Sequence, residues 1–234
     1  FQADFVVLDN LQDLNVTDVF YKGKLVDRNA PIRVKTCGRA LKHTVHLDKV
    51  KAEQFVLPIG KKKTHVIGIN PSQITTEDLA VSLQPAANYV PTDGYSKVAA
   101  VERHHNTGKI GVAVAKGYGI RNGAVASSVS HDSHNIIVIG DNDRDMALAV
   151  DEIIRTQGGY TVVENGEVFE TLPLPIMGLM SDAGFESVNE TLGRMIKKAH
   201  EMGVPADIEP FITLSFLALP VIPTLRITPR GLCL

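Results

Sequence analysis

The sequence predicts an α+β fold in which a mainly antiparallel or mixed sheet packs against two longer helices. Short apolar runs rich in β-branched residues recur between residues 64 and 139, separated by polar or glycine-rich turns. Two later segments instead repeat apolar residues at helical spacing. Because the strands follow one another in hairpins and do not alternate with helices, an antiparallel or mixed sheet is favoured over a doubly wound parallel one.

The first strands are expected within residues 1–10 and 18–26. Lys22-Gly23 has the composition of a two-residue hairpin turn between the apolar triplets on either side. Two or three strands alone are barely stable in water, so we expect them to need neighbouring strands from a preceding part of the protein. Residues 27–58 show little periodicity and are interpreted as a connector with short helical or extended pieces.

Six further strands are expected in the middle of the chain. They cover residues 64–69, 79–83, 97–102, 110–115, 124–129 and 135–139. The glycine-rich segment 117–123 is interpreted as a hairpin connection between two of them. Its glycines miss the dinucleotide-binding spacing by one residue and precede a strand, where that motif needs a helix.

A first helix is expected after Asp141-Asn142-Asp143, whose side chains can cap it, and before Gly158-Gly159. The dipeptide Asn165-Gly166, between two β-type runs, predicts a hairpin. Ser181-Asp182 is expected to cap a second helix. Its apolar stripe comprises Phe185, Val188, Leu192, Met195, Ile196, Ala199 and Met202, closed by Gly203, and is expected to lie in the core. Residues 210–225 predict a short buried helical turn that runs into an extended edge segment.

The composition excludes several classes of function. Apolar residues make up 44% of the chain and charged residues 21%, and the formal net charge is −2. The sequence has no basic patch interleaved with aromatic residues, so nucleic-acid binding is not predicted. The longest apolar stretch is too short to span a bilayer. Cys37 and Cys233 are far apart in the sequence and form no Cys-x-x-Cys pair, so neither a disulfide framework nor a zinc knuckle is indicated. We therefore expect a soluble, cytoplasmic protein.

Three polar clusters interrupt the apolar scaffold at strand ends or helix starts, where folds usually place functional groups. They are Glu102-Arg-His-His105, the block Ser130-His-Asp-Ser-His-Asn135, and Ser181-Asp182. A buried polar group without a partner costs about 1–3 kcal/mol, so something must satisfy the second block. A turn that caps its own backbone, a metal and a polar substrate are the alternatives.

Metal binding is the weakest of these alternatives. His131 and His134 are three positions apart, and such positions point to opposite faces of a strand. The His-Glu-x-x-His helix of zinc proteases is absent, and so is the Gly-x-Ser-x-Gly elbow of serine hydrolases. Backbone capping and substrate contact both stay open for residues 130–135, as do function and a surface role for His104 and His105. The other histidines outside these clusters, His43, His46, His65 and His200, are interpreted as structural.

Four stretches carry a resemblance to a known family. They are Glu102-Arg-His-His-Asn-Thr-Gly108, Ala126-Ser-Ser-Val-Ser-His-Asp-Ser-His-Asn135, Leu172-Pro-Leu-Pro-Ile-Met-Gly-Leu-Met-Ser-Asp182 and Pro210-Phe-Ile-Thr-Leu-Ser-Phe-Leu-Ala-Leu-Pro-Val-Ile-Pro223. Together they resemble the C-terminal region of bacterial adenine deaminase. Residues 1–30 look like the last strands of the β-sandwich of metal-dependent amidohydrolases, and residues 31–234 like the C-terminal domain of the deaminase.

The resemblance implies an enzyme that converts adenine and water to hypoxanthine and ammonia. In that family a metal centre in a (β/α)-barrel, manganese or iron, activates hydroxide. The barrel is expected to precede residue 1, so we expect no metal ligand and no catalytic residue in this chain, and no activity of the chain alone. We expect His131, Asp132, Ser133, His134, Asn135, His104, His105, Ser181 and Asp182 to help close the adenine pocket against the barrel. The alternatives are a structural or oligomerisation domain without substrate contact, and a free-standing purine-binding module.

Overall fold

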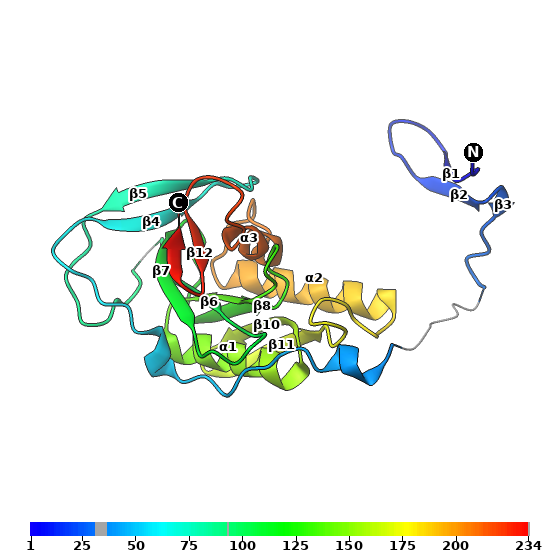
Figure 1. Cartoon of the computed structure of the whole chain (residues 1–234). Coiled ribbons are helices and arrows are strands. Elements are labelled where there is room, and N and C mark those ends of the chain that lie inside the picture. The colour runs from blue at the N-terminus through cyan, green and yellow to red at the C-terminus, as the bar shows by residue number, and fades with distance from the viewer. Residues whose placement is uncertain (31–36, 93, 234) are drawn as a thin grey trace. The chain divides into compact units, whose positions relative to one another are not determined.

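The computed structural model describes residues 1–30, 37–92 and 94–233, and the chain divides into two compact units, Phe1–Thr36 and Cys37–Leu234 (Figure 1). The predicted domain boundary after residue 30 adjoins residues 31–36, which lie outside the described residues. None of the described helices has the length and apolarity that crossing a membrane requires.

The first unit is a three-stranded antiparallel sheet. It consists of β1 (Phe5–Leu8), β2 (Val16–Tyr21) and β3 (Lys24–Leu25). Lys22 and Gly23 both have positive φ, as a two-residue turn between twisted strands requires, and the predicted hairpin is confirmed. The strand expected across residues 1–10 is shorter, only β1. No residue from 1 to 30 is buried, so this sheet lacks a core of its own within the described residues.

The second unit is built on one mixed sheet of eight strands in the order β11-β10-β8-β9-β6-β7-β4-β5. The strands are β4 (Thr64–Ile69), β5 (Thr76–Val81), β6 (Tyr95–Val101), β7 (Ile110–Lys116), β8 (Gly123–Ser127), β9 (Ile136–Gly140), β10 (Gly159–Glu164) and β11 (Glu167–Pro173). β4 and β7 pair in parallel, and the other neighbouring strands pair antiparallel. The predicted α+β class with a mixed sheet is confirmed.

Helices cover both faces of this sheet (Figure 1). α1 (Asp143–Thr156) packs on one face, and α2 (Phe185–Glu201) and α3 (Pro210–Leu217) pack on the other. The central strand β9 shows why its sequence is apolar throughout. Ile136 and Val138 face the α1 layer, whereas Ile137 and Ile139 face the α2 and α3 layer, so alternate residues enter two cores.

Short elements complete the second unit. Two 3-10 helices, η1 (Arg39–Lys42) and η2 (Ala52–Phe55), interrupt the connector, as its weak periodicity predicts. After α3 the chain ends in the small hairpin of β12 (Arg226–Thr228) and β13 (Gly231–Cys233), which packs beside β6 and β7. The hairpin predicted at Asn165-Gly166 is confirmed, because both residues have positive φ between β10 and β11.

A buried ion pair joins the sheet to α1. Lys97 on β6 is 1% exposed, and its Nζ lies 2.5 Å from Oδ1 of Asp143 in the first turn of α1. The same ammonium also donates to the carbonyl of Phe55 and to Oδ1 of Asn88. The three N–H groups of the ammonium thus have three acceptors, which compensates for the water that the buried charge has lost.

Several sequence predictions about these elements are wrong in detail. Asn142 caps α1 as expected, accepting a hydrogen bond from Asp145 N, but the left-handed C-cap residue of the helix is Gln157 and not one of the two glycines that follow it. Gly184 is the N-cap of α2 without a side-chain bond, so Ser181-Asp182 does not cap it. Phe185 lies outside the core at 74% exposure, because it occupies the first position of α2.

Two predictions about strands are also corrected. The strand expected at 79–83 begins earlier, at Thr76, since it pairs with the whole of β4. Residues 117–123 are no hairpin connection, because β7 and β8 do not pair with each other. β9 and β6 lie between them in the sheet, so this segment crosses from one part of the sheet to another.

Candidate functional site

Loops that carry the three polar clusters leave the sheet at the same end. Val101, the last residue of β6, pairs with Ile136, the first residue of β9. Residues 102–109 and 128–135 therefore emerge side by side. On the neighbouring strands, Ser127 pairs with Tyr160, and Gly159 pairs with Pro173, the last residue of β11. The loop after β11, residues 174–184, consequently starts at this end too.

Arg103 links these loops through one buried side chain. Arg103 is 1% exposed, and its guanidinium donates to three carbonyl oxygens, those of His134, of Thr44 at 3.0 Å and of Met177 at 3.0 Å. Its backbone N–H donates to Oδ1 of Asn135. Burial lowers the pKa of Arg103 to about 10, so the group stays charged at neutral pH, with carbonyl dipoles as its partners.

The loop after β11 forms a tight turn at Ile176–Met180 around Gly178. Ile176 and Met180 exchange backbone hydrogen bonds, and the hydroxyl of Ser128 donates to the carbonyl of Gly178 at 2.6 Å. Together with the Arg103 bond to Met177, these contacts fix the turn on the end of the sheet. The structure thus brings residues 102–105, 130–135 and 176–180 together.

Backbone groups hold the turn at residues 131–135 in place. His131 N donates to the carbonyl of Ser215 in α3, and His134 N donates to the carbonyl of Ser130. The carbonyl of Ser133 lies 2.8 Å from Nε2 of His104, so the two histidine-bearing loops touch. His134 has a φ of 49°, a backbone conformation that is uncommon for residues other than glycine and asparagine.

The side chains of the same turn make few hydrogen bonds within the described residues. Nδ1 of His134 and Oγ of Ser130 are buried without a hydrogen-bond partner among the described residues. Ser133 Oγ and Asn135 Oδ1 accept only long bonds, of 3.4 and 3.3 Å, from backbone N–H groups. Within the described residues, these side chains therefore do little backbone capping, and much of their hydrogen-bonding capacity is unused.

Burial and a nearby positive charge favour the neutral form of one imidazole of this turn. Burial, and then the positive charge of Arg103, lower the pKa of His134 below its ordinary value. A neutral imidazole has one nitrogen that donates and one that accepts, so it can contact a heterocycle carrying both kinds of group. The ring of His131 lies 6.1 Å from that of His134 and 5.1 Å from that of Phe216 in α3.

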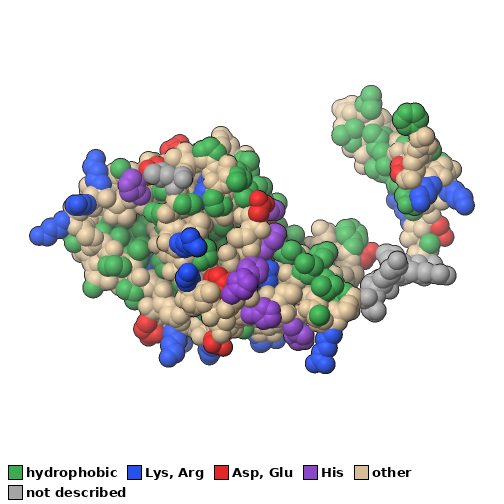
Figure 2. Space-filling view, in the orientation of Figure 1, with side chains coloured by type: hydrophobic (Ala, Val, Ile, Leu, Met, Phe, Trp, Pro, Cys, Tyr) green, Lys and Arg blue, Asp and Glu red, His purple; other side chains and the backbone are tan. Residues whose placement is uncertain are grey.

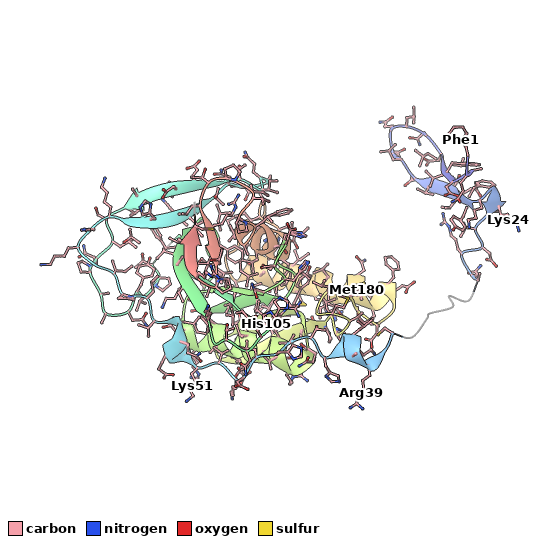
Figure 3. The ribbon with its side chains drawn as sticks, viewed as in Figure 1. Phe1, Lys24, Arg39, Lys51, His105 and Met180 are labelled. Carbon is pink, nitrogen blue, oxygen red and sulfur yellow. The ribbon has the colours of Figure 1, made fainter. Side chains whose placement is uncertain are left out.

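Other expected site residues lie further out. Asp182 forms an ion pair with Lys42 at 2.5 Å, and Ser181 accepts a hydrogen bond from Ala183 N, so these polar contacts lie away from the histidine-bearing loops. His105 and Asp132 are exposed at the surface of their loops. Figure 2 shows histidine side chains gathered in a row on one face of the second unit, and Figure 3 labels His105 within it.

Sequence reasoning missed two contributors to this region. The sequence indicates Arg103 only as part of a polar cluster, and it gives no functional role to Thr44 or to His46, which is interpreted as structural. In the structure, His46 N donates to the carbonyl of Arg103, and both the carbonyl and the hydroxyl of Thr44 accept from its guanidinium. The available signal was an arginine that closely follows an apolar strand, with no acidic residue at helical or hairpin spacing to pair with it.

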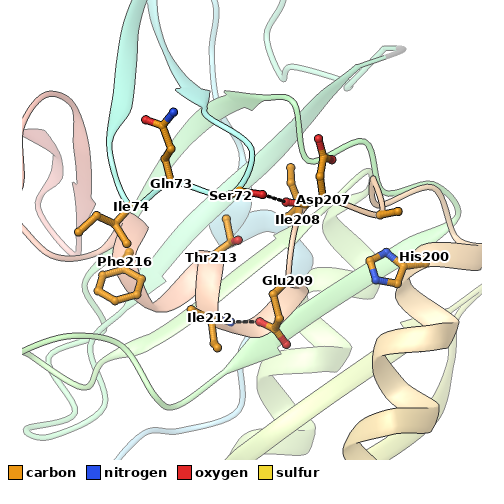
Figure 4. A pocket seen from close by; sticks show the side chains of 11 residues that line it. Ser72, Gln73, Ile74, His200, Asp207, Ile208, Glu209, Ile212, Thr213 and Phe216 are labelled. Atoms are coloured by element: carbon orange, nitrogen blue, oxygen red, sulfur yellow. Dashed lines mark hydrogen bonds between the residues drawn. The ribbon is translucent and has the colours of Figure 1, made fainter. Parts of the chain in front are cut away.

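A separate cleft of about 420 Å³ is lined by residues of α3 and of the segment that precedes it (Figure 4). Its walls include Glu209, His200, Asp207 and Phe216, the last of which also contacts His131. Glu209 caps α3 by accepting from Ile212 N. Burial nevertheless raises the pKa of Glu209, since desolvation outweighs the hydrogen bonds to its carboxylate.

Comparison with known proteins identifies the family. The model of the adenine deaminase C-terminal domain matches residues 73–233. An adenine deaminase of Desulfitobacterium hafniense (strain Y51) is 50% identical over 99% of this chain and 41% of its own length. The adenine deaminase of Nitratidesulfovibrio vulgaris (strain DP4) is 45% identical over 98% of this chain and 41% of its own. An adenine deaminase 2 of Carboxydothermus hydrogenoformans is 40% identical over 99% of this chain and 42% of its own length.

The chain belongs to the adenine deaminase family. It spans about two fifths of the length of the relatives it matches and corresponds to their C-terminal part. The residues matched by the adenine deaminase domain include all nine expected site residues as well as Arg103. The resemblance noted in the sequence is thereby confirmed.

The described residues of this adenine deaminase chain do not fit the metal centre that the family implies. Nowhere in residues 1–30, 37–92 and 94–233 do three or more histidine, cysteine, aspartate or glutamate side chains gather in a way that could hold a metal ion. His131 and His134 lie near each other without a carboxylate or thiol to complete a site. No step of the chemistry is therefore assigned to a metal held by these residues.

Proposed function

We propose that this chain is the C-terminal part of an enzyme that hydrolyses adenine to hypoxanthine and ammonia. In that reaction a C–O bond forms between water and C6 of the purine, and the bond from C6 to the exocyclic nitrogen breaks. The amino group takes one proton from water and leaves as ammonia, and the other proton stays on hypoxanthine at N1. We assign the turn at residues 131–135, together with His104, to the wall that faces the purine.

One observation carries this proposal: the backbone of the turn is anchored, while two buried side-chain atoms in and beside the turn have no hydrogen-bond partner among the described residues. Nδ1 of His134 is buried and unpaired, and the neighbouring hydroxyl of Ser130 is too. Leaving such groups unpaired costs about 1–3 kcal/mol each, so a polar partner from outside the described residues is expected. Purines present ring nitrogens that accept and amino groups that donate, which matches a neutral imidazole beside an amide.

The role proposed for these residues is to bind, orient and exclude water. His134 would contact a ring nitrogen or the exocyclic group, and Asn135 would offer its amide. Closing a site against water strengthens the electrostatic interactions inside it. We propose that the metal of the family, manganese or iron, and its ligands belong to a barrel in the part of the protein that this chain does not include, and that the chain alone has no deaminase activity.

The first unit is proposed to be the end of a β-sandwich continued by that other part. Its three strands leave residues such as Phe5, Val6 and Leu25 exposed, and a sheet of this size needs additional strands or a covering layer for stability. We also propose that the protein works in the cytoplasm, and that adenine and the barrel are its partners. A homo-oligomer remains compatible with this assignment.

The test is kinetic and uses the full-length protein that contains this chain. His134→Asn removes the imidazole but keeps a residue that tolerates positive φ, so the turn is preserved. We expect kcat/KM for adenine to fall about tenfold or more, equivalent to about 1.4 kcal/mol. The control is His65→Gln, which removes an imidazole from β4 that pairs with Asp78.

Unchanged kinetics of His134→Asn would support the rival function, a structural or assembly domain without substrate contact. Calorimetry of the 234-residue chain with adenine distinguishes the third candidate function, a free-standing purine-binding module, from the other two. Binding without the rest of the protein would favour a free-standing purine-binding module, whereas the proposed role predicts no measurable binding.

A further inference from the structure

Next to the histidine-bearing loops, an apolar patch is exposed that the fold of this chain does not cover. It consists of Leu41, Met177, Met180 and Phe185. Figure 2 shows apolar side chains beside the row of histidines, and Figure 3 marks Met180 near the start of α2. Isolated exposed apolar residues are ordinary, but a contiguous group of large ones signals a contact surface.

Two of these side chains are presented by a fixed backbone. The turn Ile176–Met180 is held by its own paired hydrogen bonds, by Ser128 through Gly178, and by Arg103 through Met177. Leu41 joins the same surface, because Met177 N donates to its carbonyl at 2.7 Å. A fixed backbone lowers the entropy cost of binding, and methionine side chains adapt to the surface they meet.

An ion pair lies at the rim of the patch. Lys42 follows Leu41 and pairs with Asp182, which follows Met180 by two positions. This pair satisfies both charges within the chain and leaves the apolar side chains as the free contact groups. An apolar centre with a satisfied polar rim is the usual anatomy of a protein interface.

We infer that this patch, Leu41, Met177, Met180 and Phe185, docks the rest of the same polypeptide, the part that precedes this region in its relatives. About three fifths of the length of those relatives lies outside this chain, which matches their C-terminal part. The patch is continuous with the turn at 131–135 through Arg103. The choice of occupant rests on the proposed function. If the turn at residues 131–135 forms a wall of the purine site, then it must contact the part of the protein that holds the purine.

The experiment measures thiol labelling in the full-length protein. Phe185→Cys and Met180→Cys are treated with iodoacetamide, and the rate at each site is read by peptide mass spectrometry. Matched controls have similar exposure elsewhere in the chain. Val221, which is 78% exposed, is the control position for Phe185, which is 74% exposed. Ile212, which is 56% exposed, is the control position for Met180, which is 51% exposed, and each control is also changed to cysteine.

A docked patch predicts labelling at least about tenfold slower than at the controls, independent of protein concentration. Equal rates at patch and control would overturn the inference. Protection that disappears on dilution would overturn it as well, because the occupant would then be a second copy. The outcome is separate from the kinetic test at His134, since a covered patch with unchanged kinetics would leave docking intact and remove the purine wall.

Discussion

The guanidinium of Arg103 occupies the space that a side chain at position 178 would need. A Cβ on Gly178 would lie 2.7 Å from Nη1 of Arg103 and 2.9 Å from its Cζ. Gly178 also has a φ of 71°, in the region that favours glycine. The close approach lets Arg103 reach the carbonyl of Met177, and so ties the turn at 176–180 to the end of β6.

Gly178→Ala should therefore destabilise the chain more than its backbone conformation alone explains. Alanine at positive φ costs about 1 kcal/mol, and the contact with Arg103 should add about 1–3 kcal/mol. Gly108→Ala is the matched control, because Gly108 has a φ of 67° with open space at its Cβ. Urea unfolding measures both variants, and equal losses would show that Arg103 moves aside freely.

Removing the Arg103 guanidinium should weaken the same region. Arg103→Met leaves three carbonyl oxygens without their donor, and we expect a loss of about 3 kcal/mol or more in the free energy of unfolding. Arg103→Lys keeps the charge but not the forked geometry, so its loss should be intermediate. Arg155→Met, which removes an exposed arginine that pairs with Glu152, is the control and should cost about 1 kcal/mol or less.

Circular dichroism during urea titration is sufficient for this comparison. If Arg103→Met unfolded at the same urea concentration as Arg155→Met, then the carbonyls of Thr44, His134 and Met177 would have to be satisfied in some other way, and Arg103 would lose its role as the link between loops.

Lys97 and Asp143 should show strong energetic coupling. Lys97→Met alone leaves a carboxylate without its charge partner and should cost about 3–5 kcal/mol. Adding Asp143→Asn removes that unpaired charge, so the double variant should be more stable than the sum of the single losses predicts, by about 1–3 kcal/mol. The exposed pair of Lys197 and Glu201 provides a control cycle, expected to yield about 0.5 kcal/mol or less. A coupling energy of similar size in both cycles would contradict the expectation that burial strengthens the interaction between Lys97 and Asp143.

Glu209 should make stability depend on pH in a defined direction. Burial raises its pKa, so the folded chain holds this proton more tightly than the unfolded chain does. Its contribution to stability is present at low pH and is lost as the pH rises through the raised value. Glu209→Gln cannot ionise but keeps an oxygen to accept from Ile212 N. The difference in Tm between Glu209→Gln and the parent should become more favourable to the variant from pH 4.5 to 7.5.

Thermal scans at several pH values test this prediction, with Thr213→Val, in the same cleft but not titratable, as the control for packing changes. A difference in Tm that stays constant with pH would mean that the carboxylate of Glu209 titrates at its ordinary value.

The sequence by itself determined the family, most strands and the two hairpins. Periods of two and 3.6 residues are local, and turns such as Asn165-Gly166 depend on the conformations that two adjacent residues allow. It also located residues 131–135, because a polar block between two apolar runs is visible without a fold.

Only the tertiary structure decided which of these residues meet. The pairing of Val101 with Ile136 places the loops of Arg103 and His134 side by side, and strand order is not encoded in any local period. The partner of Asp182 was likewise invisible, since Lys42 lies 140 positions away in the sequence. Phe185 fits an apolar helical stripe, yet it is exposed, because what covers a helix end depends on neighbouring elements and not on spacing.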